Sequence, residues 1–242
     1  MYKNYIFEFY GTLADIRTNE GKPYLWKKVS EIYSAYGAIY TGPELRKAYA
    51  KLIAEKVSVL PKNGEPDVTA VFAELFEQKG VTCDKTLARH IAIMFRALSR
   101  KFVCAYECVR ETLQELKNRG KGVYLLSNAQ TDFTRPEIDM VGLTSYFDGI
   151  FISSEVGFKK PSQEFYDTLI STYGLNPKEC LMVGNDESAD IQGAHLAGMD
   201  SLYIHTEISP QEDIESTATY VVMDGDWKKV QKILLDTCEN DL

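Results

Sequence analysis

The sequence has little positive charge for its length. Its 242 residues include 27 Lys and Arg against 35 Asp and Glu, which gives a net charge of −8 at pH 7. Nucleic acids and anionic membranes both attract basic patches, and no basic cluster offsets this acidic balance. We therefore predict that the protein has no nucleic-acid partner and no membrane partner.

Long apolar runs and paired cysteines are missing as well. No run approaches the roughly 20 residues of a membrane-spanning helix, and the first residues, MYKNYIFEFYG, do not have the pattern of a secretory signal. The five cysteines are odd in number and show no CxxC spacing, which argues against a disulfide framework or a zinc site. We expect reduced thiols in a cytoplasmic protein.

A block of helices occupies the stretch from about Pro23 to Arg100. Apolar residues recur there at helical spacing, and Pro43, Asp67 and Asp84 stand where helices begin. No strand pattern interrupts the block. Four helices with no strand between them predict a separate helical unit.

The rest of the chain alternates between short buried strands and helices. Strand patterns lie at 5–9, 122–126, 149–152, 180–183, 201–204 and 219–222, and helix patterns at 107–118, 163–173, 190–197 and 227–238. Such alternation predicts an α/β fold with a Rossmann-like parallel sheet covered by helices on both faces. Because the helical block interrupts this pattern after the first strand, we predict a core domain of residues 1–16 plus 104–242 and an inserted all-helical cap domain of residues 17–103.

Polar residues cluster in four segments that follow predicted strands. In an open parallel sheet, ligands bind beyond the carboxyl ends of the strands, so these segments should converge. They are FEFYGTL (7–13), LSNA (126–129), SSEVGFKKPS (153–162) and VGNDESADIQGAHLAGM (183–199).

In order and spacing, these four segments resemble the signature motifs of the haloacid dehalogenase (HAD) superfamily of hydrolases. The helical block falls where this family places a helical C1-type cap. The resemblance implies an HAD-like fold and a Mg²⁺-dependent phosphatase that acts on a small phosphorylated metabolite. For the oligomeric state, we expect a monomer or a homodimer.

The resemblance also implies roles for individual residues. Glu8 stands where the family has the aspartate nucleophile that forms a covalent intermediate, and Lys160 would neutralise this carboxylate together with the phosphate. The Ser127 hydroxyl and the backbone N–H groups beside it would hold phosphoryl oxygens. The implied phosphate-binding residues are Gly11, Thr12, Ser127, Asn128 and Lys160, and the implied catalytic residues are Glu8, Tyr10, Ser127 and Lys160.

The implied metal site consists of oxygen donors, which Mg²⁺ prefers. In the usual form of the fourth motif an aspartate directly follows the glycine, but here that position is Asn185, which offers a carbonyl oxygen without charge. Asp186 and Asp190 are therefore the main candidates, with Glu8 and the backbone carbonyl of Tyr10 completing the set.

Two residues depart from the phosphatase pattern. Glu8 is longer than aspartate by one methylene, roughly 1.5 Å, and a misplacement of ~1 Å can cost ~10²-fold in rate, so we expect reduced turnover. Tyr10 replaces the aspartate that serves the family's phosphatases as general acid–base.

Two alternatives follow from these departures. Tyrosine at position 10 also resembles the metal-free 2-haloacid dehalogenases, which need a cap arginine for the substrate carboxylate; Arg46, Arg89 and Arg96 are available. The second alternative is a non-catalytic relative that binds a phosphometabolite or a protein partner, and Glu8 is the residue that favours it.

Overall fold

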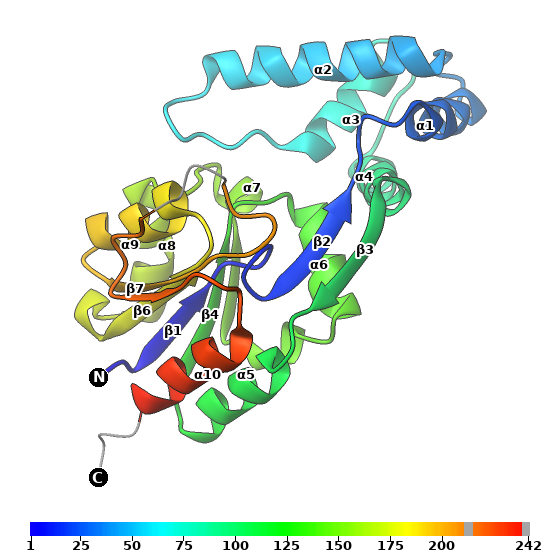
Figure 1. The fold of residues 1–242 in the computed structure, drawn as a ribbon. Helices are drawn as coiled ribbons and strands as arrows, with labels where there is room; N and C mark the ends of the chain where they lie inside the picture. The colour runs from blue at the N-terminus through cyan, green and yellow to red at the C-terminus, as the bar shows by residue number, and fades with distance from the viewer. Residues whose placement is uncertain (211–214, 239–242) are drawn as a thin grey trace.

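The computed structural model describes residues 1–210 and 215–238 and divides into a sheet domain and a helical cap (Figure 1). Six parallel strands form one sheet in the order β5-β4-β1-β6-β7-β8. The strands are β1 (Asn4–Phe7), β4 (Gly122–Ser127), β5 (Gly149–Ile152), β6 (Cys180–Gly184), β7 (Asp200–Ile204) and β8 (Tyr220–Val222). The predicted α/β class and the parallel sheet are confirmed.

Helices cover both faces of the sheet because alternate residues of the buried strands point to opposite faces. On β1, Tyr5 and Phe7 pack in one apolar cluster with α5 and α10, whereas Ile6 packs in another with α8 and α9. The helices of this domain are α5 (Val109–Asn118), α6 (Thr131–Met140), α7 (Ser153–Val156), α8 (Gln163–Tyr173), α9 (Gln192–Leu196) and α10 (Trp227–Asp236).

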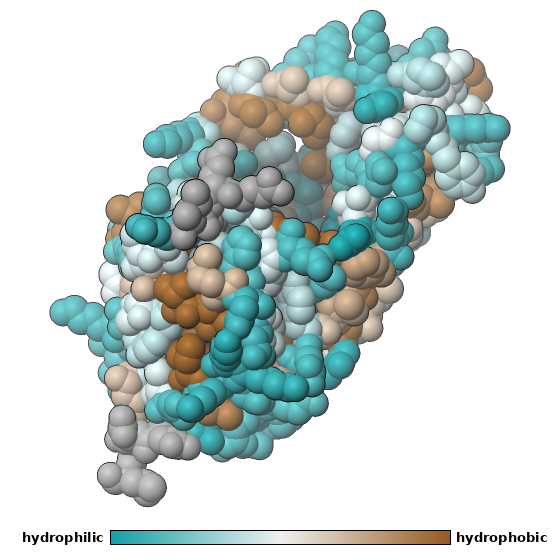
Figure 2. Space-filling view, in the orientation of Figure 1, coloured by the Kyte–Doolittle hydropathy of each residue, from teal (hydrophilic) through white to brown (hydrophobic). Residues whose placement is uncertain are grey.

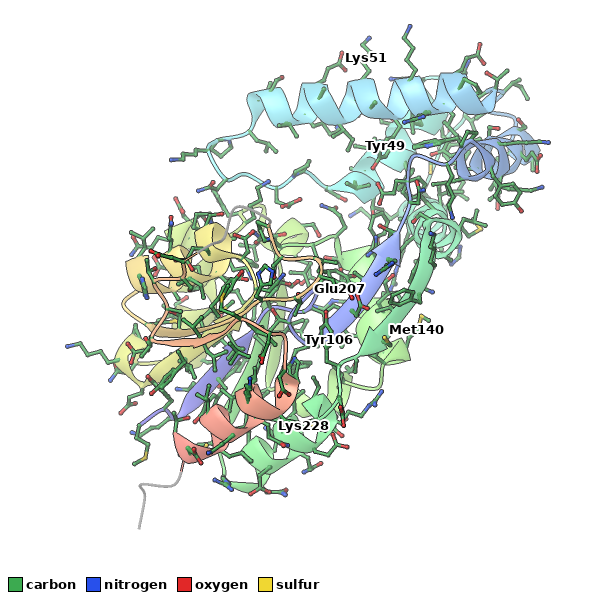
Figure 3. All side chains as sticks on the ribbon, in the orientation of Figure 1. Tyr49, Lys51, Tyr106, Met140, Glu207 and Lys228 are labelled. Atoms are coloured by element: carbon green, nitrogen blue, oxygen red, sulfur yellow. The ribbon has the colours of Figure 1, made fainter. Side chains whose placement is uncertain are left out.

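The cap consists of the four predicted helices, and Figure 1 shows them above the carboxyl edge of the sheet. They are α1 (Pro23–Ala35), α2 (Gly42–Val59), α3 (Val68–Glu77) and α4 (Lys85–Ser99). Their inner faces form a separate aromatic-rich core. On α2, for example, Tyr49 lies on the side facing α3 and stacks on Phe72 with ring centroids 5.5 Å apart, while Lys51 points away from the cap (Figure 3).

A two-stranded antiparallel ribbon joins the two domains, and sequence patterns did not predict it. In this ribbon β2 (Ala14–Thr18), which precedes the cap in the sequence, pairs with β3 (Arg100–Ala105), which follows it. Both strands are short and only partly buried. The strand β2 has no apolar run, and the apolar residues 102–105 of β3 were not recognised as a strand because they follow the helical block directly. The predicted domain boundaries, at 16/17 and 103/104, fall inside these two strands.

Other elements differ from the predicted bounds. The first strand ends at Phe7 rather than at residue 9, and α6 and α7 were not predicted. The helix predicted over 190–197 begins earlier, as a π-helical turn at Glu187–Ile191 that continues into α9. Among the described helices, none is long and apolar enough to cross a membrane.

Candidate active site

Glu8 follows β1 directly and lies at the carboxyl edge of the sheet, with only 7% of its surface exposed. Its Oε1 accepts hydrogen bonds from the N–H of Phe9, at 2.6 Å, and from the hydroxyl of Ser127. Its Oε2 accepts from the N–H of Asn128, at 3.2 Å, and from the ammonium of Lys160, at 2.5 Å. The first three motifs therefore meet at one carboxylate.

Lys160 links this carboxylate to the fourth motif. Its fully buried ammonium lies 2.7 Å from Asp190 Oδ1 and donates to the carbonyl of Leu126 at 2.6 Å. Burial alone would lower the pKa of Lys160, but the charges of Asp190 and Glu8 outweigh it and raise that pKa above its ordinary value. Burial also raises the pKa of the Asp190 carboxyl above its ordinary value, while the charge of Lys160 opposes this shift.

Gly11 and Thr12 contact the fourth motif through Asn185. The Thr12 hydroxyl donates to Asn185 Oδ1 at 3.1 Å, and Asn185 Nδ2 donates to Ser209 at 3.4 Å. Gly11 has a φ of +76°, and a Cβ there would lie 2.3 Å from Asn185 Nδ2. Only glycine fits a left-handed backbone so close to another side chain. The structure thus places Gly11 and Thr12, two of the five predicted phosphate-binding residues, against the amide of Asn185.

The carboxylate of Asp186 is engaged locally. Its Oδ1 accepts from the N–H and hydroxyl of Ser188 and from the N–H of Ala189, so it caps the π-helical turn. Asp190 Oδ2 accepts from the N–H groups of Asn185 and Asp186, at 2.9 and 3.0 Å, which holds the loop after β6 against that turn.

The side chain of Tyr10 is directed toward α6. Its hydroxyl donates to Glu137 and lies 3.1 Å from the hydroxyl of Thr134. Burial, with the charge of Glu137, raises the pKa of Tyr10 above its ordinary value. Glu137 is fully buried and also receives hydrogen bonds from Arg96 of α4, at 2.8 and 3.2 Å, and from Arg100 of β3, at 2.7 Å. This junction of cap and core lies beside the first motif. Glu137 was not predicted as a site residue, because nothing in the neighbouring sequence marks a buried carboxylate.

The loop between α2 and α3 closes on the third motif. The N–H of Lys159 donates to the carbonyl of Asn63, and the N–H of Glu65 donates to the carbonyl of Gly157, both at 2.9 Å. Gln130, which follows the second motif, donates to Glu65 Oε1 at 2.9 Å. These contacts hold the cap over the site, and the surface is hollowed between the two domains (Figure 2).

The donor types near Glu8 fit a hard cation, although several are already engaged. Asp190 Oδ1 is buried and has no hydrogen bond apart from its ion pair with Lys160, and Asn185 supplies an amide oxygen. Within residues 1–210 and 215–238, no three His, Cys, Asp or Glu side chains are arranged to hold a metal ion. A Mg²⁺ ion would thus depend on neutral donors as well, which predicts modest affinity.

Comparison with known proteins gives several relatives. The phosphoserine phosphatase of Thermus thermophilus is 31% identical over 160 residues, which cover 66% of this chain and 62% of that protein, so the match spans less than two thirds of its length. The glyceraldehyde 3-phosphate phosphatase of Methanothermobacter thermautotrophicus is 28% identical over 200 residues, 82% of this chain and 85% of that protein.

A solved HAD phosphatase from Thermococcus onnurineus has the same fold, with a TM-score of 0.61 at 20% identity over 96% of this chain and 97% of that one. The family model for haloacid dehalogenase-like hydrolases matches residues 2–198. The resemblance of the four motifs is therefore confirmed at the level of the family: the chain belongs to the haloacid dehalogenase-like hydrolases.

Proposed function

We propose that this protein is a Mg²⁺-dependent phosphatase of a small phosphorylated metabolite, with turnover reduced by Glu8. The observation that carries the proposal is the convergence of Glu8, Ser127, Asn128, Lys160 and Asp190 on one buried point at the carboxyl edge of the sheet. The two curated relatives described above are both phosphatases, which favours the same class.

In this proposal each side chain has a separate task. A Glu8 oxygen attacks phosphorus and the alcohol leaves, so the phosphoryl group is carried on Glu8 until water releases it. Ser127 and the N–H of Asn128 hold the oxygens that are not transferred, and Lys160 offsets their charge. Because the hydroxyl of Tyr10 is bonded to Glu137, the leaving group has to take its proton from water, which favours good leaving groups.

Mg²⁺ would be held by oxygen atoms of Glu8, Tyr10 (backbone carbonyl), Asn185, Asp186 and Asp190. When bound, it would reduce the repulsion between the phosphate and the acidic residues of the site.

The alternative of a 2-haloacid dehalogenase is less well supported. That reaction needs a cap arginine free to bind the substrate carboxylate. Of the three candidates, Arg96 is bonded to Glu137, and Arg89 pairs with Asp132 of α6 at 3.0 Å. These two arginines thus contact the core, and Arg46 is the remaining candidate, exposed on α2.

Replacement of Glu8 by Asp tests the proposal. Hydrolysis of p-nitrophenyl phosphate and of a panel of phosphomonoesters is measured with Mg²⁺ and with EDTA. We expect Glu8→Asp to hydrolyse the esters at least ~10²-fold faster than the native protein, since it restores the shorter side chain of aspartate. The variant should lose this activity in EDTA.

The matched control is Glu111→Asp, the same substitution on the exposed surface of α5, which should change nothing. Failure of both the native protein and a folded Glu8→Asp variant to release phosphate from any ester would reject the proposal. Chloride release from 2-chloropropionate in EDTA would favour the dehalogenase instead.

A further inference from the structure

Four hydrogen-bond donors surround the Glu8 carboxylate, and we call them the anion cradle. They come from three segments far apart in the chain and consist of the N–H of Phe9, the hydroxyl of Ser127, the N–H of Asn128 and the ammonium of Lys160. Two donors bind Oε1 and two bind Oε2, so both oxygens of Glu8 are engaged. Hydrogen bonds to an ionised acceptor are the strong class, particularly where water is excluded.

The donor pattern of the anion cradle also suits a tetrahedral oxyanion. Two oxygens on one central atom, each facing two donors, are common to a carboxylate and to one edge of a phosphate group. Three of the four donors, those of Ser127, Asn128 and Lys160, are the groups that the phosphatase proposal assigns to phosphoryl oxygens. The Glu8 carboxylate therefore lies where a phosphoryl group would be held.

The length of the glutamate side chain makes this possible. An aspartate at position 8 would end roughly 1.5 Å closer to β1, because it has one methylene fewer. Hydrogen bonds of 3.2 Å or less cannot all be kept over such a displacement. The shorter side chain would release some of these donors and leave room beyond the carboxylate.

We infer that Glu8 acts as a built-in anion that occupies the phosphoryl site, and that an external phosphate must displace it in order to bind. The inference rests on the proposed function in that it takes the anion cradle as the phosphate site. It adds a competition between the protein's own carboxylate and its ligand. A competitor attached to the chain acts at an effective concentration of ~1 mM or more, so the native protein binds phosphate weakly.

Phosphate binding without metal tests this inference. Inorganic phosphate is titrated calorimetrically in EDTA into the native protein, Glu8→Ala and the isosteric Glu8→Gln, whose folding is checked by thermal unfolding. We expect Glu8→Ala to bind phosphate at least ~10-fold more tightly than the native protein, because both the competing carboxylate and its charge are gone. Glu8→Gln should also gain affinity, since its amide N–H₂ cannot accept from Lys160 or Asn128.

Two controls separate a vacated cradle from a general loss of negative charge. Glu111→Ala removes one exposed carboxylate and should leave phosphate binding at the native level. Adding Lys160→Met to Glu8→Ala should abolish the gain, because the ammonium is the charged donor of the anion cradle. No gain in either Glu8 variant, or a gain that survives Lys160→Met, would overturn the inference.

The outcomes also separate this inference from the proposed function. If Glu8→Asp hydrolyses phosphate esters but Glu8→Ala gains no affinity for phosphate, the phosphatase proposal stands and the built-in anion is rejected. If Glu8→Ala gains affinity while Glu8→Asp is inert, the anion cradle is a phosphate-binding site without phosphatase chemistry.

Discussion

Replacement of Glu137 by Gln should weaken the attachment of the cap to the core. Glu137 is fully buried and accepts hydrogen bonds from Arg96 of α4, Arg100 of β3 and Tyr10 of the loop between β1 and β2. The two arginine side chains are only 11% and 17% exposed, so water cannot replace the lost carboxylate effectively. The variant would leave two guanidinium groups close together without their common counter-charge.

The magnitude follows from this burial. Breaking a buried ion pair by removing one partner costs about 3–5 kcal/mol, because the remaining charge is left desolvated. In a protein of this size, 1 kcal/mol changes the melting temperature by about 2–4 °C. We therefore expect Glu137→Gln to lower the melting temperature by roughly 6–20 °C.

Thermal unfolding followed by circular dichroism measures this shift. The control is Glu155→Gln, since Glu155 also forms two hydrogen bonds with an arginine, Arg135, but with side chains 33% and 41% exposed. Exposed pairs contribute less than about 1 kcal/mol, so the control should lose no more than about 4 °C. An equal loss in the two variants would refute the argument that burial sets the cost.

Three further predictions concern Gly11, the N-cap of α2 and the cysteine thiols. Gly11→Ala should lower the free energy of unfolding by about 2 kcal/mol or more, because the new Cβ would clash with Asn185 and the backbone there has a φ of +76°. An unchanged free energy of unfolding in urea would contradict this prediction. Thr41→Ala removes the side-chain cap of α2 and should cost about 1 kcal/mol, and Thr41→Ser should restore it. Burial raises the pKa of Cys180 to about 11, so its thiol stays protonated as the pH rises to 8. Iodoacetamide should therefore modify the exposed Cys104 before Cys180, as followed by mass spectrometry, and equal rates of modification would contradict this prediction.

Much of the fold was predictable because it depends on local patterns. Buried strands such as β6 appear in the sequence as short apolar runs, and α8 has the bounds that its spacing predicted. The β2–β3 ribbon was not predicted, since its strands are only partly buried and each pairs with the other across the whole cap. Local patterns carry no information about such a distant partner.

The same division applies to the site. From the sequence alone, the carboxyl-end rule for parallel sheets was enough to predict that the segments of Glu8, Ser127, Lys160 and Asp190 converge. Their catalytic, phosphate-binding and metal-binding roles remain predictions. The sequence also identified Glu8 as the unusual residue, and its extra methylene is a property of the amino acid itself.

Only the tertiary structure decided which donors Glu8 meets. Hydrogen bonds depend on distances of a few ångströms between segments far apart in the chain, and no spacing in the sequence encodes those distances. For the same reason, the pairing of Arg96 with Glu137 and the closure of the α2–α3 loop on Lys159 could be found only in the folded chain.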